Sequence, residues 1–363
     1  MSAVAQRPPG RWAAGRVATP RIALLGTGGV GGAFVARCEQ LRAAGRAIPG
    51  FAWMGNSRAL AARADDPVAA LATLRAAPPR ADAWAPWTEA AGLERGDVLV
   101  DATSSDAVAG WHAEWLARGV HVVTANKLGT GAALARCHAI AAAAAASGAG
   151  YGDAATVGAG LPLLRSIRAL VAGGDRIRGI DGVLSGSLAW LFGGYDGARP
   201  FSTLVREASR QGYAEPDPRT DLSGEDVRRK LLILARAAGW PLEAGQVRVE
   251  SLLGSALAAA GAGEVDGLLP TLDHALEQRR RKAAAAGARL RFVGRVDAGG
   301  GRAGIEALPA HHRLSAGGGT DNVVAITSCR YQASPLLVRG PGAGAAVTAA
   351  ALLDDVLALV STR

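Results

Sequence analysis

The feature that most constrains this chain is a glycine-rich loop between an apolar strand and a helix. The strand covers residues 21–26 (RIALLG), and the loop after it places glycines at Gly26, Gly28 and Gly31. In such a loop the first glycine allows a tight turn, the second lets a pyrophosphate approach the backbone, and the third lets the helix pack on the strand. Because the loop opens a helix, it predicts a dinucleotide-binding site at the helix N-terminus.

Strands and helices alternate through the first part of the sequence. Further short apolar strands are expected at residues 52–55, 97–103 and 121–125, and helices follow the last two of them. This alternation is typical of a parallel sheet whose crossover connections are right-handed. We therefore predict an α/β fold with a Rossmann-type parallel sheet.

The pattern changes after a glycine-rich turn at residues 158–162. A strand at 179–184 precedes helices that extend from about residue 202 to 239, and four strand-like segments lie between residues 289 and 339. A closing helix is expected at residues 345–361. This order indicates an α+β domain inserted before the last helix returns to the first domain.

These patterns divide the chain into four parts. Residues 1–20, rich in Arg and Pro, are expected to form a flexible N-terminus. Residues 21–156 are predicted to form the dinucleotide-binding domain and residues 157–338 the inserted α+β domain, where the substrate is expected to bind. Residues 339–363 are the C-terminal helix that returns to the nucleotide domain.

Charge and cysteine content limit the class of partner. The formal net charge is +9, but the arginines are scattered and form no basic stripe for nucleic acid. No apolar run is long enough for a membrane-spanning helix. Cys38, Cys137 and Cys329 show no metal or disulfide spacing, which indicates the reducing cytoplasm. We therefore expect a small-molecule substrate, with neither nucleic acid nor a membrane as partner.

Lysine is rare in this arginine-rich chain. Only Lys127, Lys230 and Lys282 occur among the 40 basic residues. Arginine does not release its proton in proteins, whereas the environment of a lysine can tune it to do so. Lysines that remain in such a chain are therefore candidates for proton transfer.

The segment 211–230 (QGYAEPDPRTDLSGEDVRRK) places five acids close to Lys230. Its two prolines stiffen the backbone around Glu215, and a helix is expected to begin near Ser223 and to run to Ala238, where Gly239 stops it. Asp226 and Lys230, four residues apart, share one face of that helix. Carboxylates can hold a substrate ammonium, and a lysine can supply a proton to an alkoxide.

The alternative for this segment is a capped surface helix. Ser223 and Asp226 have the spacing of a capping box, and Asp226 with Lys230 could be an ordinary ion pair worth a few tenths of a kcal/mol. The sequence of the segment alone leaves both interpretations open.

The end of the second strand bears on the choice of cofactor. The residues there are Asn56, Ser57 and Arg58, without the acid that would bind the ribose 2′-hydroxyl of NAD. An arginine at this place can meet a 2′-phosphate, which favours NADP and leaves NAD as the alternative. Arg58 could also simply lie on a helix surface.

The segment 211–230 resembles homoserine dehydrogenases and matches each fixed position of their motif G-Y-x-E-P-D-P-x-x-D-L-x-G-x-D-V-x-R-K. Four further segments are similar to that family: 123–127 (VTANK), 156–162 (TVGAGLP), 182–188 (GVLSGSL) and 342–349 (GAGAAVTA). The resemblance covers residues 21–361. Its motifs are most similar to the dehydrogenase half of bifunctional aspartokinase–homoserine dehydrogenases.

The resemblance implies reversible reduction of L-aspartate 4-semialdehyde to L-homoserine in threonine, methionine and isoleucine biosynthesis. It implies that Glu215 and Asp226 hold the substrate amino group and that Lys230 is the catalytic proton donor. Lys127 would lie near the nicotinamide, and Asp221 would support the substrate pocket. The rival interpretations are a dehydrogenase for a different amino-acid semialdehyde and a non-catalytic NADP-binding regulator of the same fold.

The resemblance also implies a cofactor pocket, a cation site and an assembly. Sodium would be bound by the carbonyls of Val157, Ala159 and Leu161, although Ala154 stands where relatives often carry an acid. A homodimer is expected, and threonine feedback through a C-terminal regulatory domain is not. The expected cofactor contacts are Gly26, Gly28, Gly29, Val30, Gly31, Arg58, Thr103, Ser104, Lys127 and Gly344.

Overall fold

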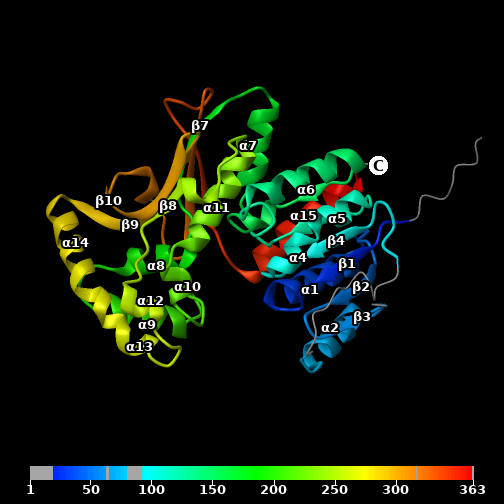
Figure 1. Ribbon diagram of the computed structural model, residues 1–363, viewed down its shortest axis with the longest axis horizontal. Helices are drawn as coiled ribbons and strands as arrows, with labels where there is room; N and C mark the ends of the chain where they lie inside the picture. The colour runs from blue at the N-terminus through cyan, green and yellow to red at the C-terminus, as the bar shows by residue number, and fades with distance from the viewer. Residues whose placement is uncertain (1–18, 63–64, 80–91, 316, 362–363) are drawn as a thin grey trace, which may run out of the picture.

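The computed structural model describes residues 19–62, 65–79, 92–315 and 317–361. The predicted flexible N-terminus therefore lies outside the described residues, apart from residues 19 and 20. Two bodies lie side by side, each built on one six-stranded sheet (Figure 1). The closing helix, red in the figure, returns from the second body to the first and lies beside α1.

The first sheet has the order β3-β2-β1-β4-β5-β6, and all its pairs are parallel except β2 with β3. The strand order reverses between β1 and β4, and ligands of such sheets bind at that switch point. The strands are β1 (Ile22–Leu25), β2 (Phe51–Gly55), β3 (Leu60–Ala61), β4 (Val98–Asp101), β5 (His121–Thr124) and β6 (Tyr151–Gly152).

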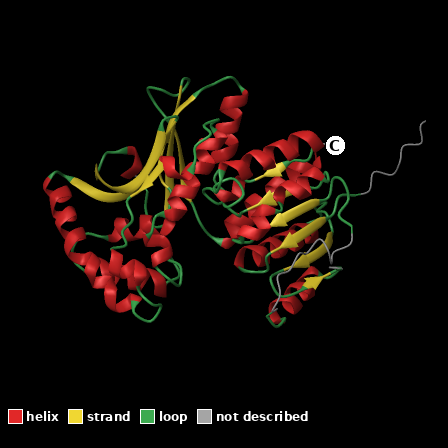
Figure 2. Cartoon of the chain, viewed as in Figure 1, coloured by secondary structure: helices red, strands yellow, loops and turns green. Residues whose placement is uncertain are grey.

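Helices cover both faces of this sheet (Figure 2). Ile22 and Leu24 of β1 pack in one cluster with residues of α1 and α15, whereas Ala23 and Leu25 pack on the other face with residues of α5 and α6. A strand buried on both faces is the expected result of such crossovers. The helices are α1 (Gly29–Ala43), α2 (Pro67–Ala76), α4 (Asp106–Gly110), α5 (His112–Ala117), α6 (Leu134–Ser147) and α15 (Ala345–Ser361).

The second sheet is mixed and has the order β12-β11-β7-β9-β10-β8. Its pairs are antiparallel except β10 with β8. The strands are β7 (Ile177–Val183), β8 (Val247–Val249), β9 (Ala288–Asp297), β10 (Gly300–Pro309), β11 (Asp321–Ser328) and β12 (Leu336–Pro341). The helices of this body are α7 (Leu163–Ala172), α8 (Gly186–Gly194), α9 (Phe201–Arg210), α10 (Arg219–Leu222), α11 (Glu225–Ala237), α12 (Ser255–Ala259), α13 (Val265–Leu268) and α14 (Asp273–Ala285). Short 3₁₀ turns are η1 (Ala154–Thr156), η2 (Ala244–Gln246), η3 (Leu269–Leu272) and η4 (Arg313–Ser315).

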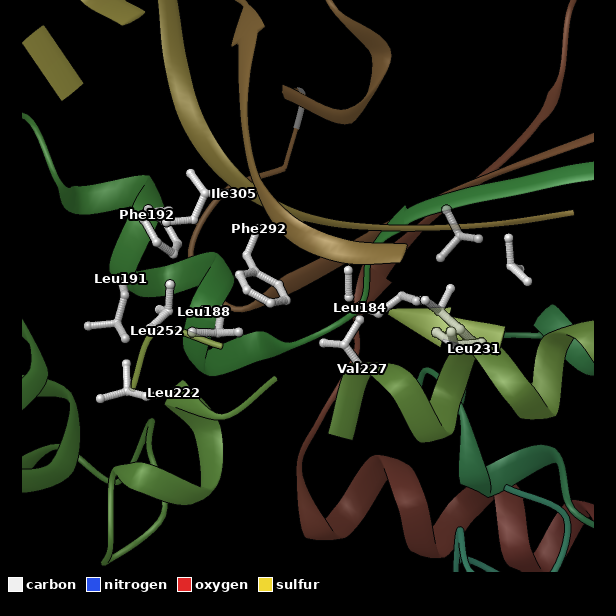
Figure 3. Close-up of a cluster of buried hydrophobic side chains, with 14 of the residues drawn as sticks. Leu184, Leu188, Leu191, Phe192, Leu222, Val227, Leu231, Leu252, Phe292 and Ile305 are labelled. Atoms are coloured by element: carbon white, nitrogen blue, oxygen red, sulfur yellow. The ribbon is translucent and has the colours of Figure 1, made fainter. Parts of the chain in front are cut away.

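The largest apolar cluster anchors the helix that carries the acid–lysine segment. Val227 and Leu231 of α11 pack in this cluster with Leu188 of α8 and Phe292 of β9 (Figure 3). Each of these four side chains is at most 2% exposed. Burying apolar side chains of this size stabilises a fold by about 1.5–3 kcal/mol each, so α11 is held firmly against the second sheet.

Candidate active site

The glycine loop forms a close-packed turn after β1. Gly26 has φ 98°, and a Cβ there would lie 2.7 Å from the carbonyl oxygen of Ala102. A Cβ at Gly31 would overlap the carbonyl oxygen of Gly26, whereas a Cβ at Gly28 would meet no described atom within 4 Å. The loop therefore needs glycine for its own packing at Gly26 and Gly31, and it is open at Gly28.

A cleft of about 840 Å³ extends from this loop over the ends of β1, β2 and β4. Among the predicted cofactor contacts, Gly26, Gly28, Arg58, Thr103 and Ser104 line it. The other predicted contacts lie outside the cleft lining: Gly29, Val30, Gly31, Lys127 and Gly344. The returning C-terminal segment comes close to the loop, because a Cβ at Gly29 would be 3.9 Å from that of Ala345.

One basic residue of the cleft, Arg75 at the end of α2, was not predicted from the sequence. Its Nε donates to the carbonyl oxygen of Thr27 at 2.7 Å, and its Nη2 donates to that of Gly28 at 3.0 Å. Arg58 donates from Nη1 to the carbonyl oxygens of Arg75 and Ala77 at 3.4 and 3.3 Å. Two guanidinium groups therefore stand at the adenosine end expected for a dinucleotide, beside the N-terminus of α1.

The acid–lysine segment forms a compact charged group. Lys230 is only 7% exposed, and its Nζ donates to the carbonyl oxygen of Leu184 at 2.7 Å and to Asp226 Oδ2 at 2.8 Å. Lys127, from the turn after β5, brings its Nζ to 3.3 Å from Asp226 Oδ1. The structure thus brings together three of the predicted site residues from both bodies.

The capped surface helix is not what the structure contains. Gly224, at φ 74°, is the residue before α11, so Ser223 lies in the preceding turn and caps Glu225 N–H rather than closing a box with Asp226. Lys230 is buried instead of solvated. A buried lysine held by one carboxylate and one carbonyl is not an ordinary surface pair.

The charges around Asp226 favour its ionised form. Burial opposes ionisation, but the ammonium groups of Lys230 and Lys127 outweigh it and hold the pKa of Asp226 well below its usual range. The carboxylate of Asp226 therefore lies ionised between the two lysine Nζ atoms. Lysine side chains held in place in a partly desolvated site can stabilise negative charge that develops on an oxygen.

Asp221 ties the extended segment to the start of α8. Its Oδ1 accepts from Ser187 Oγ at 2.6 Å, and its Oδ2 accepts from the backbone N–H of Glu215 at 2.8 Å. Burial raises the pKa of Asp221 above its ordinary value, against the opposing effect of these two hydrogen bonds. Glu215 joins the site through its backbone, while its side chain is exposed. Ser187, which lies in the GVLSGSL turn, was not singled out from the sequence.

The turn predicted to bind sodium is well defined. Gly158 and Ala159 both have positive φ, 75° and 51°, and the carbonyl oxygen of Leu161 accepts from the N–H of Leu163 at 2.8 Å. Asp153, the acid that precedes this turn in the sequence, pairs with Arg168, whose two Nη atoms lie 2.6 and 2.9 Å from its oxygens. The described residues contain no group of three or more His, Cys, Asp or Glu side chains that could hold a metal ion.

No helix in the described part of the chain combines the length and the apolar character that crossing a bilayer requires.

Family models match both bodies of this structure. The model described as "Homoserine dehydrogenase, NAD binding domain" matches residues 26–151, and the model described as "Homoserine dehydrogenase" matches residues 162–357. The chain belongs to the homoserine dehydrogenase family. Its members are NAD(P)-dependent oxidoreductases, and the predicted fold class, a Rossmann-type sheet with an additional α+β domain, is confirmed.

Individual homoserine dehydrogenases show how far the similarity extends. The chloroplastic bifunctional aspartokinase/homoserine dehydrogenase 1 of Zea mays is 44% identical over 73% of this chain and 29% of its own length. The chain thus spans less than a third of that relative. The homoserine dehydrogenase of Saccharomyces cerevisiae is 37% identical over 72% of this chain and 74% of its own. The crystal structure of a homoserine dehydrogenase from Thiobacillus denitrificans superposes with a TM-score of 0.69 at 25% identity, covering 94% of this chain and 73% of the other.

Proposed function

We propose that this chain catalyses the reversible NAD(P)H-dependent reduction of L-aspartate 4-semialdehyde to L-homoserine. The observation that carries the proposal is the position of Asp226, which lies within 3.3 Å of Lys127 and within 2.8 Å of Lys230. The similarity to the yeast homoserine dehydrogenase, over 74% of that enzyme, supports it. The reaction would serve threonine, methionine and isoleucine biosynthesis, and the widely spaced cysteines favour the cytoplasm as its location.

The residues of the charged group divide the work of the reduction. A reduced nicotinamide cofactor, held along the cleft over the glycine loop, would supply a hydride for the aldehyde carbon, and negative charge would then develop on the carbonyl oxygen. Lys230 supplies the proton to this oxygen, directly or through a water that it orients, and Lys127 stabilises the charge electrostatically. Asp226 keeps both ammonium groups in place.

The acids hold the amino acid part of the substrate. A carboxylate has about four acceptor positions, so Asp226 can accept from the substrate ammonium in addition to its two lysines. Glu215 provides the second carboxylate from its exposed position. Asp221 supports the pocket through Ser187 and the backbone of Glu215.

The cleft over the glycine loop fits a dinucleotide with a 2′-phosphate. Gly28 leaves room for the pyrophosphate beside the backbone, and the second strand ends without an acid that would repel a phosphate. Arg58 and Arg75 are the positive groups at that end. We therefore assign NADP as the preferred cofactor, with NAD as the alternative.

The domain limits, the assembly and the cation belong to the same proposal. Residues 21–156 bind the cofactor and residues 157–338 bind the substrate and pair two copies of the chain in a homodimer, while residues 339–363 complete the cofactor side. A sodium ion at Val157, Ala159 and Leu161 would be bound by carbonyl oxygens alone, because Asp153, the acid that precedes this turn in the sequence, pairs with Arg168.

The test is a spectrophotometric assay of homoserine oxidation with NADP or NAD. We expect Lys230→Ala to lose at least about 100-fold in kcat while its Kd for NADPH changes little. Lys282→Ala is the matched control, because Lys282 is exposed on α14. No homoserine-dependent signal with either cofactor would contradict the proposal. A larger signal with another hydroxy amino acid would favour the rival substrate, and NADPH binding without any turnover would favour the regulator.

A further inference from the structure

A network of hydrogen-bonded polar side chains extends from Thr103, which lines the cofactor cleft, through Asp101 of β4 and His112 of α5 to Tyr151 of β6. Asp101, the last residue of β4, is fully buried. Its Oδ1 accepts from the N–H and the hydroxyl of Thr103 at 2.8 and 2.7 Å, and its Oδ2 lies 3.0 Å from Nε2 of His112. The other ring nitrogen of His112, Nδ1, is 3.1 Å from the hydroxyl of Tyr151.

The ring of His112 joins the two ends of this group of side chains. Burial raises the pKa of Tyr151 well above its ordinary value, so its hydroxyl keeps its proton. Both ring nitrogens of His112 have a partner, Tyr151 at Nδ1 and Asp101 at Nε2. The ring is fully buried, so water has no access that would let it replace either partner.

The same network of hydrogen-bonded side chains extends to the turn that carries Lys127. Asn126 donates from Nδ2 to the carbonyl oxygen of Ser105 at 2.8 Å and to the hydroxyl of Thr103 at 3.4 Å. Thr103 is in turn held by Asp101. The residue directly before Lys127 is therefore tied to the loop that lines the cofactor cleft.

The other end of that turn rests on the aromatic pair. A Cβ at Gly129 would overlap the hydroxyl of Tyr151 and would lie 3.1 Å from Nδ1 of His112. Backbone this close to two side chains moves when they move, because protein interiors have little free volume. Lys127 thus stands between an anchor at Asn126 and a support at His112 and Tyr151.

We propose that Asp101, His112 and Tyr151 are positioning residues for Lys127, fixing the turn from which its ammonium reaches Asp226. The inference rests on the proposed function, in which Lys127 stabilises charge in the chemical step. Errors of about 1 Å in such a group can cost up to about 100-fold in rate. If these three residues only stabilised the fold, their substitution would change the melting temperature and would leave kcat per folded molecule unchanged.

The first experiment compares two tyrosines that each lose one buried hydroxyl contact. Tyr151→Phe removes the hydroxyl that is hydrogen-bonded to His112, and Tyr195→Phe removes the 3.2 Å hydrogen bond from Tyr195, the residue after α8, to Glu277. We expect Tyr151→Phe to lower kcat for homoserine oxidation about tenfold with KM for NADP changed less than twofold, and Tyr195→Phe to keep both values. Equal kcat values for the two variants would overturn the proposal.

The second experiment does not need turnover, so that it separates this proposal from the proposed function. Since the chain has three lysines, a protein labelled with ¹³C at lysine Cε gives a spectrum of three sites, which Lys127→Arg and Lys282→Arg assign. We expect Tyr151→Phe to shift the Lys127 signal, and Tyr195→Phe to leave it in place. An unchanged Lys127 signal in Tyr151→Phe would overturn the positioning role, whether or not the wild-type protein oxidises homoserine.

Discussion

The ammonium of Lys127 lies 3.3 Å from the carboxylate of Asp226, and this contact joins the first body of the molecule to the second. The same carboxylate holds Lys230 at 2.8 Å. Two ammonium groups this close would repel each other without the negative charge between them. Asp226 therefore holds the ammonium groups of both lysines in position, independently of any contact that it makes with substrate.

Asp226→Asn removes that charge with almost no change of shape. We expect kcat/KM for homoserine to fall at least about 100-fold, since both lysines lose their common partner, while the Kd for NADPH stays within about twofold. Steady-state kinetics and a fluorescence titration with NADPH measure the two effects. The control is Asp217→Asn on the same segment, because Asp217 pairs with Arg219 instead of a lysine. Equal losses in the two variants would count against the special role of Asp226.

The glycine loop allows stability and cofactor binding to be separated. Gly31→Ala would force a Cβ against the carbonyl oxygen of Gly26, and backbone cannot rotate away as a side chain can. We expect a loss of about 1–3 kcal/mol in unfolding free energy. Gly28→Ala faces open space among the described atoms at φ −70°, so that its melting temperature should hold while NADPH binding weakens. Identical melting temperatures for both variants would contradict this assignment of the two glycines.

Arg58 and Arg75 differ in what else they hold, and this difference predicts different cofactor effects. Arg75 also binds the carbonyl oxygens of Thr27 and Gly28, so Arg75→Ala should weaken NADPH and NADH together by loosening the loop. Arg58→Ala should weaken NADPH about tenfold and leave NADH almost unchanged, because the other contacts of this side chain, to the carbonyl oxygens of Arg75 and Ala77, lie outside the glycine loop. The Kd values of each variant for NADPH and NADH measure these two effects. A Kd for NADPH that Arg58→Ala leaves unchanged would rule out Arg58 as the phosphate contact.

The parts of the structure that the sequence predicted depend on local patterns. Apolar strands that alternate with helices specify the first sheet, and the closing helix has the predicted bounds, Ala345–Ser361, because its apolar stripe is continuous. The contact between Asp226 and Lys230 was expected because the two residues are one helical turn apart. In these cases the signal and the structure lie within a few residues of each other.

The parts that were missed depend on contacts between distant residues. Arg75 is 48 residues from Thr27, its partner in the cleft, and nothing in its own neighbourhood marks it. His112 and Tyr151 are 39 residues apart and meet only because β4, β5 and β6 are neighbours in the sheet. The capping box failed for a local reason, since Gly224 adopts φ 74° and separates Ser223 from the helix. A glycine at that place was the available signal.

The last prediction uses two aspartates whose pKa values shift in opposite directions. Burial raises the pKa of Asp221, so the folded protein binds its proton more tightly than the unfolded chain. Stability from this group is then complete below the unfolded pKa of about 3.9 and is lost as the pH rises through the folded value. The hydrogen bond from Arg219 lowers the pKa of Asp217, so its contribution is present above about pH 3.9 and is lost as the pH falls.

Urea unfolding between pH 3 and 7 measures both contributions when each aspartate is changed to asparagine. As the pH rises, wild type should lose stability relative to Asp221→Asn and should gain stability relative to Asp217→Asn. The two replacements are chemically identical and lie four residues apart. A general effect of charge on the segment would therefore change the difference in unfolding free energy between wild type and variant in the same direction with pH for both replacements. Opposite directions require that Asp221 is shielded from water beside Ser187 while Asp217 faces its arginine, which is the arrangement that leaves Asp221 free to support the substrate pocket.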